Sequence, residues 1–182
     1  MVLFSQKLAR LLNKSITKGR FILTSGKPSS YYLNARKVTL TPEGAYLATQ
    51  LVFKIIKENR IKAVGGPTVG ADPILGSLAY LAYLEKYPLK TFIIRKHAKN
   101  HADKKQIEGP SLNKRDQILL IDDTTTTGKS LIESAQVLRS RGFKVHKAAS
   151  LIDRNEGAKE NLANIGIEFS SVFTIKNFKI CE

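Results

Sequence analysis

The chain has 182 residues, 42% of them hydrophobic, which suits one substantial core and is too short for two domains of ordinary size. We therefore expect a single domain over residues 1–182, with no membrane span, because no apolar run approaches the roughly 18 residues that a span needs. The 30 lysines and arginines outnumber the 15 acidic residues. The formal net charge of +15 indicates either anionic partners, with phosphates on a small substrate or on nucleic acid, or simply a basic proteome.

The first segment is basic and amphipathic. Apolar residues at helical spacing, from Leu3 to Leu12, predict a helix. Basic residues accumulate along this segment and beyond it, and no acidic residue precedes Glu43, a pattern that is also typical of transit peptides. We favour a basic first helix, because a motif that begins at Phe21 leaves little removable sequence ahead of it.

Basic residues are dispersed along the chain, without an uninterrupted basic tail or a low-complexity segment. We therefore expect no dedicated nucleic-acid-binding arm and no nucleic-acid partner. The only cysteine, Cys181, cannot form an intrachain disulfide. The expected compartment is the reducing cytoplasm, and no membrane partner is expected.

Two β-prone pieces, Phe21–Leu23 and Tyr31–Leu33, flank a turn-like Ser-Gly-Lys-Pro, which predicts a small hairpin or hood. A second helix is expected after Pro42-Glu43. From Ala63 onward, apolar runs alternate with helical stretches; the expected elements are 63–64, 74–84, 92–94, 118–121, about 130–141, 145–152 and 167–175. This alternation predicts an α/β fold with a mostly parallel twisted sheet flanked by helices, in which ligands collect beyond the carboxyl ends of the strands.

The strongest motif covers residues 118–130, where an apolar strand is followed by Asp122 and Asp123 and then by a hydroxyl-rich loop that opens a helix. The loop amides and the positive helix end suit a phosphate monoester, and the adjacent carboxylates suit ribose hydroxyls. A Walker phosphate loop also ends in Gly-Lys-Ser, but its required first glycine falls at Asp123. An ordinary helix cap accounts for one residue of this run and not for all of it.

A second polar segment begins at Arg95, after the apolar run that ends at Ile94. Residues 95–105 hold five lysines or arginines and two histidines, and a glycine follows at position 109. The segment is too polar to form a packed element, so we expect a mobile cationic flap. Cations that a closing loop delivers would stabilise the charge on a departing pyrophosphate and exclude water. A solvated basic loop is the alternative, and it is the usual one for a charge run.

Four segments resemble a known family. The Asp-Asp-x-x-Thr-Thr-Gly-x-Ser run resembles the phosphoribosyl pyrophosphate signature of type I phosphoribosyltransferases. The flap, Arg-Lys-x-x-Lys-x-His followed by Ile-Glu-Gly, resembles the catalytic loop of orotate phosphoribosyltransferases. Residues 21–32 resemble the hood that this family places over the base, and the Gly/Pro-rich residues 65–74 resemble its pyrophosphate loop. Together with Arg154 these segments span residues 21–154 in the expected order.

The resemblance implies a type I phosphoribosyltransferase-like fold whose small hood is formed by about residues 1–40 and the C-terminal region. It implies transfer of the 5-phosphoribosyl group from phosphoribosyl pyrophosphate to orotate, which gives orotidine 5′-monophosphate and pyrophosphate in pyrimidine biosynthesis. It also implies a homodimer whose catalytic loop reaches the neighbouring subunit's site. Magnesium is expected as the cofactor, held by substrate oxygens and water, with no direct side-chain ligand.

The same resemblance assigns roles to residues. Lys99, His101, Asp122 and Asp123 would be catalytic. Phosphoribosyl pyrophosphate would be bound by residues of the flap and of the loop: Arg95, Lys96, Lys99, His101, Asp122, Asp123, Thr124, Thr125, Thr126, Thr127, Gly128, Lys129 and Ser130. Orotate would be bound by Thr126 and by Arg154, which would pair with the carboxylate of orotate. Tyr31 and Tyr32 would provide aromatic cover for the base.

Two positions depart from the pattern of some family members, which carry lysines where this chain has Thr24 and Gly70. Arg36 or Lys37 is our hypothesis for the replacement charge. A purine phosphoribosyltransferase would share the carboxylate loop but would not account for the flap or the hood. A regulator of the same fold that binds RNA or DNA is the other alternative; the net charge of +15 favours it, and the retained cations of the flap oppose it.

Overall fold

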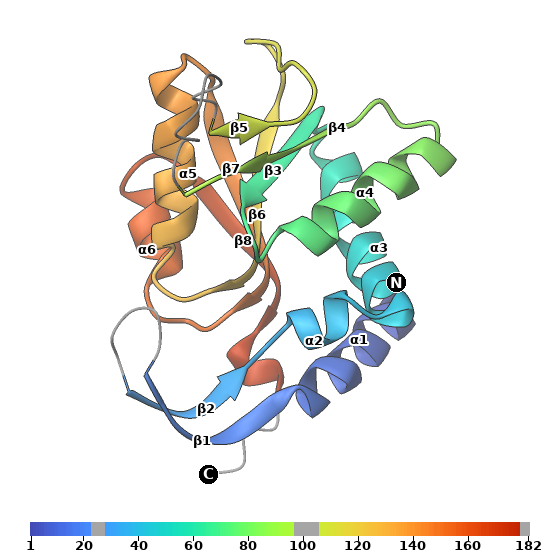
Figure 1. The fold of residues 1–182 in the computed structure, drawn as a ribbon, viewed down its shortest axis with the longest axis vertical. Coiled ribbons are helices and arrows are strands. Elements are labelled where there is room, and N and C mark those ends of the chain that lie inside the picture. The colour runs from blue at the N-terminus through green and yellow to red at the C-terminus, as the bar shows by residue number, and fades with distance from the viewer. Residues whose placement is uncertain (23–27, 97–105, 179–182) are drawn as a thin grey trace.

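The structure is a computed structural model that describes residues 1–22, 28–96 and 106–178. Its centre is a six-stranded sheet in the order β5-β4-β3-β6-β7-β8 (Figure 1). These strands are β3 (Ala63–Pro67), β4 (Lys90–Ile94), β5 (Ile107–Glu108), β6 (Ile118–Thr125), β7 (Val145–Asp153) and β8 (Glu168–Thr174). All neighbours pair in parallel except β4 and β5, which are antiparallel.

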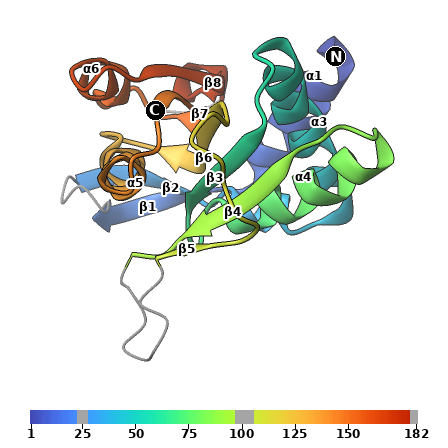
Figure 2. The ribbon, with the colours of Figure 1, turned by 90° about the horizontal axis from the view of Figure 1, so that it is seen from above.

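Helices cover both faces of the sheet, and Figure 2 shows the two layers on either side of it. One layer holds α1 (Val2–Lys14), α3 (Pro42–Glu58) and α4 (Asp72–Leu84), and the other holds α5 (Lys129–Ser140) and α6 (Ala158–Ala163). Each layer packs its own hydrophobic core against the sheet. Leu8 and Leu12 of α1 are fully buried in the first core, so the basic first segment is a packed helix, as expected. No helix of the described residues is long and apolar enough to cross a membrane.

A separate two-stranded ribbon lies near the carboxyl ends of the parallel strands. It pairs β1 (Ile16–Ile22) with β2 (Pro28–Leu33) in antiparallel fashion (Figure 1). The one-turn helix α2 (Arg36–Thr39) leads from β2 to α3. The start of α3 is fixed locally, because the Thr41 hydroxyl accepts a hydrogen bond from the Gly44 N–H at 3.1 Å. At the other end of the chain, β8 leads into the 3-10 turn η1 (Ile175–Asn177).

The expected α/β architecture is confirmed, and three details differ from the sequence expectation. β1 begins at Ile16 because Leu33 of β2 pairs with it. β6 continues through both aspartates to Thr125, because its pairing with β7 extends as far as Thr125 opposite Asp153. Part of the polar segment after Ile94 is an ordered element, because β5 pairs with the end of β4. The extent of the hood over about residues 1–40 stays a prediction.

Candidate active site

A cleft of about 250 Å³ lies where the carboxyl ends of β6 and β7 face β2 and α2. Its walls include Tyr32, Arg36, residues 122–131 and Arg154. The cleft therefore gathers the two carboxylates, the hydroxyl-rich loop and the strand-end arginine that the sequence analysis assigned to one site. It lies at the position where open parallel sheets bind their ligands.

The carboxylates of Asp122 and Asp123 are held by the backbone that follows each of them. The Asp123 N–H donates to Oδ1 of Asp122 at 2.8 Å, and the Thr124 N–H donates to Oδ1 of Asp123 at 2.6 Å. Burial raises the pKa of Asp122 well above its ordinary value, and the neighbouring charge of Asp123 adds to that rise. Burial also raises the pKa of Asp123, although the Arg36 guanidinium, whose Nε is 4.0 Å from Oδ2, opposes it. The result is a fixed, partly desolvated pair of acceptors.

The loop that follows the carboxylates presents hydrogen-bond donors. Gly128 precedes α5 with a left-handed φ of 80°, a conformation that favours glycine, and no side chain of the described residues caps this helix. The amides of the first turn are therefore available at the positive end of the helix dipole. The hydroxyls of Thr124 and Thr125 are buried and have no hydrogen-bond partner in the described part of the chain. This arrangement suits a bound phosphate.

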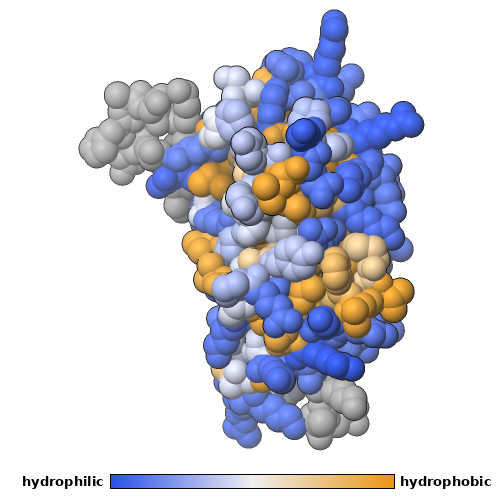
Figure 3. Space-filling model, turned by 90° about the vertical axis from the view of Figure 1, so that its right-hand side faces the viewer, coloured by the Kyte–Doolittle hydropathy of each residue, from blue (hydrophilic) through white to orange (hydrophobic). Residues whose placement is uncertain are grey.

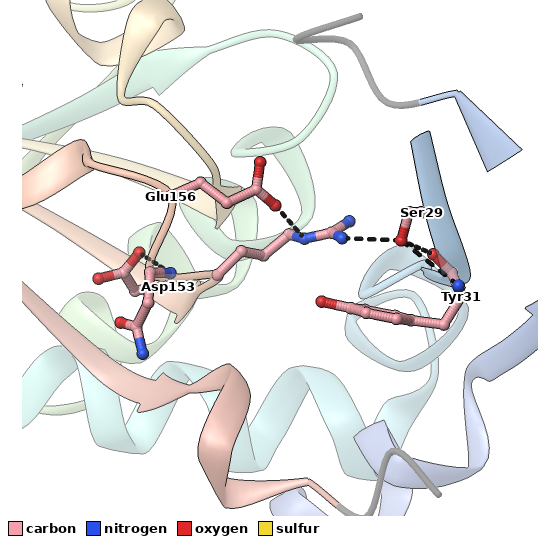
Figure 4. Close-up of polar contacts among 6 residues, drawn as sticks. Ser29, Tyr31, Asp153 and Glu156 are labelled. Atoms are coloured by element: carbon pink, nitrogen blue, oxygen red, sulfur yellow. Dashed lines mark hydrogen bonds and ion pairs between the residues drawn. The ribbon is translucent and has the colours of Figure 1, made fainter. Parts of the chain in front are cut away.

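Arg154 joins the end of β7 to the ribbon. Its backbone N–H donates to the carbonyl oxygen of Thr125 at 2.9 Å, which continues the β6–β7 pairing. Its side chain is 5% exposed. As Figure 4 shows, Nη2 donates to the Ser29 hydroxyl at 3.2 Å, and the guanidinium lies 4.6 Å from the centre of the Tyr31 ring. A buried cation stacked on an aromatic ring suits a flat anionic ligand.

The loop between β3 and α4 lies directly against the carboxylates. A β-carbon built on Gly70 would lie 2.6 Å from Oδ1 of Asp122 and 2.7 Å from Oδ1 of Asp123. In the same loop the peptide bond between Thr68 and Val69 is cis. A lysine in place of Gly70 would thus begin beside the acid pair, whereas in this chain the cation paired with Asp123 is Arg36.

Four residues expected to bind phosphoribosyl pyrophosphate surround a neighbouring hollow of about 300 Å³: Arg95, Lys96, Lys129 and Ser130. The last two also line the first cleft, so the two cavities adjoin. Arg95 is held by Glu108 of β5, with its Nη1 at 3.1 Å from Oε1. Thr68 of the β3–α4 loop completes part of the wall. Basic groups therefore lie beside the carboxylate cleft.

Some expectations lie outside the described residues, namely the turn within residues 23–27, with Thr24, and Lys99 and His101 within residues 97–105. Of the two candidate replacement cations, Arg36 lines the cleft, while Lys37 is exposed and is not part of its wall. Tyr32 lines the cleft. Tyr31 is not part of its wall but contacts Arg154, which is.

Sequence reasoning assigned no role to Glu156, whose Oε1 lies 3.0 Å from Nε of Arg154. The signal for it was an acidic residue two positions after the strand-end arginine. Spacing alone does not show whether such a side chain turns toward the arginine or toward solvent. The role of Ser29 was missed for a similar reason, because its partner lies 125 residues away in the chain.

Comparison with known proteins agrees with this geometry. Residues 37–179 match the phosphoribosyl transferase domain family. The matched region contains the whole six-stranded sheet, the acid pair and Arg154. The fold and the site therefore define a phosphoribosyltransferase.

Individual relatives specify the branch. The orotate phosphoribosyltransferase of Nostoc sp. is 38% identical over 175 residues, which cover 96% of this chain and 84% of the relative. That of Aquifex aeolicus is 37% identical over 179 residues, covering 96% and 97%. The crystal structure of Mycobacterium tuberculosis H37Rv orotate phosphoribosyltransferase in complex with phosphoribosyl pyrophosphate has a TM-score of 0.78 to this fold, with 27% identity and coverage of 96% and 98%. The chain belongs to the orotate phosphoribosyltransferase family and not to the purine phosphoribosyltransferases that the sequence analysis considered as an alternative.

Proposed function

We propose that this chain transfers the 5-phosphoribosyl group from phosphoribosyl pyrophosphate to orotate and releases orotidine 5′-monophosphate and pyrophosphate. The observation that carries the proposal is that the acid pair, the uncapped start of α5 and Arg154 all line one cleft. Each of the three matches a different part of the reactants: ribose, phosphate and base carboxylate. The relatives named above support the same pair of substrates.

The phosphoribosyl group is anchored at two points. Its 5′-phosphate accepts hydrogen bonds from the first-turn amides of α5 and from hydroxyls at the end of β6 and in the loop that follows it. Its ribose hydroxyls donate to Asp122 and Asp123, whose carboxylates are already held by backbone N–H groups. Fixing the ribose in this way brings its anomeric carbon to the base without further loss of orientational freedom.

The base is held from the opposite wall. Arg154 donates to the carboxylate of orotate, and Thr126 and Tyr32 flank the ring. Tyr31 supports the guanidinium from below. N1 of orotate then attacks the anomeric carbon while the bond from that carbon to pyrophosphate breaks, and the bonding electron pair leaves with pyrophosphate. The proton on N1 is released as the new bond forms and is taken up by the departing pyrophosphate. No covalent intermediate with the enzyme is required.

Charge develops at two places during this step. The ribose ring becomes cationic, and the acid pair provides negative charge beside it. The leaving pyrophosphate becomes more negative, and Arg95 and Lys96 lie in the adjoining hollow to receive it. By family resemblance, Lys99 and His101 add further positive charge beside the pyrophosphate.

Magnesium is the cofactor that we propose. Its ligands would be pyrophosphate oxygens, ribose hydroxyls and water, which fit a hard cation, with no direct side-chain ligand. Asp122 and Asp123 would hold the ribose hydroxyls beside it. When bound, magnesium neutralises pyrophosphate charge. Activity should disappear with a chelator and return with added magnesium.

We also propose a homodimer, in which the flap of one subunit serves the site of the other. Three exposed apolar or aromatic side chains of α4 support a second copy as the partner of this face: Tyr80, Tyr83 and Leu84. Figure 3 shows hydrophobic residues exposed among hydrophilic ones on the side of the molecule where α4 lies. Light scattering after gel filtration measures the mass, and a monomer that is fully active would overturn this part of the proposal.

The decisive test is an assay of orotate consumption, monitored by absorbance, in a mixture of purified protein, phosphoribosyl pyrophosphate and magnesium. Parallel reactions contain uracil, adenine or hypoxanthine in place of orotate. We expect turnover of orotate only, and only with all components present. Turnover of another base would change the proposed base specificity. No turnover with any base, together with salt-sensitive binding of RNA or DNA, would favour a nucleic-acid-binding regulator of the same fold. A reducing cytosol is the compartment that we propose for the reaction.

A further inference from the structure

A carboxylate that the proposed reaction does not use lies behind Arg154. Oε1 of Glu156 is 3.0 Å from Nε of Arg154, and the two side chains are 19% and 5% exposed. Oε2 of Glu156 is buried and has no hydrogen-bond partner among the residues that the structure describes. Burying an ion pair of this kind commonly costs more in desolvation than the attraction returns. The pair is therefore weak evidence for a purely stabilising role of Glu156.

The loop after β7 directs Glu156 back toward the cleft. Oδ1 of Asp153 accepts a hydrogen bond from the Asn155 N–H at 2.9 Å. Asn155 and Gly157 both have left-handed backbones, with φ of 56° and 99°, a conformation that these two residue types tolerate best. Glu156 lies between them at a bend, and its side chain points to Arg154 (Figure 4), whereas Asn155 is exposed.

The guanidinium of Arg154 is restrained from three directions. Oε1 of Glu156 forms an ion pair with Nε at 3.0 Å, without the alignment of a hydrogen bond. Ser29 accepts from Nη2 at 3.2 Å, and the Tyr31 ring lies against the face with its centre 4.6 Å from the central carbon. The ring restricts tilt, and Glu156 restricts rotation in the plane. Within the described chain Nη1 has no partner, although Arg154 forms part of the cleft wall. The Nη edge is the one left for a ligand.

We infer that Glu156 is a positioning residue, which turns the Nη edge of Arg154 toward the carboxylate of orotate so that the two groups meet in paired hydrogen bonds. This inference rests on the proposed function, because that function supplies the carboxylate. A guanidinium that is fixed beforehand loses less freedom when the base binds. Glu156 also neutralises the buried arginine while no base is bound. Its effect is therefore specific to orotate and does not extend to phosphoribosyl pyrophosphate.

Kinetics of two substitutions test this role. Glu156→Ala removes the restraint, and we expect the KM for orotate to rise about tenfold while the KM for phosphoribosyl pyrophosphate stays unchanged. The Tm should fall, because the buried Arg154 loses its counter-charge. Glu156→Gln keeps a polar side chain of the same shape beside Nε, and its KM for orotate should stay within about threefold of wild type. Glu160→Ala removes an exposed carboxylate from α6 and is the matched control, with no expected effect. An unchanged KM for orotate in Glu156→Ala would overturn the inference.

A second readout needs no turnover. In protein labelled with 15N-arginine, the Nε–H signal of Arg154 is assigned by its absence from Arg154→Lys. We expect slow exchange of this proton with solvent in the wild type and in Glu156→Gln, and exchange about tenfold faster in Glu156→Ala. Equal exchange in all three proteins would overturn the restraint. If instead the exchange pattern is as expected and the wild type does not consume orotate, the proposed function fails and the restraint stands.

Discussion

Gly70 packs so closely against Asp122 that a β-carbon at position 70 would come within 2.6 Å of the carboxylate oxygen Oδ1. The same built carbon would lie 2.7 Å from Oδ1 of Asp123. The β3–α4 loop therefore packs against the same two oxygens that accept the backbone hydrogen bonds. Any side chain at this position must displace one or both carboxylates from the N–H groups that hold them.

Gly70→Ala should accordingly raise the KM for phosphoribosyl pyrophosphate about tenfold, since a small displacement of the ribose acceptors weakens both of their hydrogen bonds. Gly76→Ala is the matched control, because nothing lies within 4 Å of a β-carbon built on that helical glycine. We expect it to keep the wild-type KM and to stabilise α4 slightly. Steady-state kinetics of both variants decide the matter, and equal KM values would show that Gly70 does not set the carboxylate position.

Asp122→Asn should lower kcat/KM more than about 100-fold and at the same time raise the Tm at neutral pH. Asparagine keeps an oxygen that accepts from the Asp123 N–H but removes a buried charge beside a second carboxylate. A gain of about 1 kcal/mol would appear as roughly 2–4 °C in a chain of this size. Thermal unfolding beside kinetic assays measures both effects, and a Tm below that of the wild type would contradict this account of the acid pair.

The pH dependence of that stability difference has a defined sign. Burial raises the pKa of Asp122 in the folded state, so the folded protein binds the proton more tightly than the unfolded chain does. Wild-type stability relative to Asp122→Asn is therefore lowest above the raised pKa. It recovers as the pH falls through that pKa toward the ordinary value of 3.8. Urea unfolding of both proteins across this range tests the prediction, and a gap that widens on acidification would refute it.

Arg36→Ala should raise the KM for phosphoribosyl pyrophosphate about fivefold, whereas Lys37→Ala should leave it unchanged. Arg36 lines the cleft and lies 4.0 Å from Asp123, where its charge favours the ionised carboxylate that ribose hydroxyls require. Lys37 is exposed outside that wall. The two single variants and the double variant separate the roles, and a double variant with the wild-type KM would remove both residues from the site.

Lys99→Ala should lower kcat strongly, by about 100-fold or more, with an unchanged Tm. This prediction comes from the sequence resemblance, because Lys99 lies outside the described residues. Lys159→Ala, which removes an exposed lysine from α6, is the control. Near wild-type kcat in Lys99→Ala would show that the assigned role is wrong.

Mixing variants tests the shared flap. If the flap serves the partner's site, inactive Lys99→Ala and Asp122→Asn subunits form heterodimers with one intact site, and random reassociation restores about a quarter of wild-type activity. Sites complete within one subunit would restore nothing. The experiment therefore separates a dimer that shares its sites from one that does not.

The extent to which the site was predictable follows from distance along the chain. Asp122 through Ser130 are consecutive, and their strand, loop and helix are all encoded in one stretch of sequence, so the phosphate and ribose site was foreseeable. The contact between Arg154 and Ser29 was not, because it depends on how the ribbon lies near β7. The approach of Gly70 to the acid pair is equally non-local, since only the β3–β6 pairing brings those segments together. The parallel sheet followed from the alternation of apolar runs, while β5 and α6 were too short to show a period.

The hydrogen bond from the Arg154 N–H to the Thr125 carbonyl also fixes the position of Arg154 along β6. The acid pair, which we propose to hold the ribose, lies on β6, and Arg154, which we propose to hold the base, follows β7. The two strands are paired in register as far as Thr125 and Asp153. Slippage by one residue would turn every side chain to the other face. The distance between the acid pair and Arg154 is therefore fixed by the backbone register of β6 and β7, whereas Ser29 and Tyr31 approach Arg154 from a separate two-stranded ribbon.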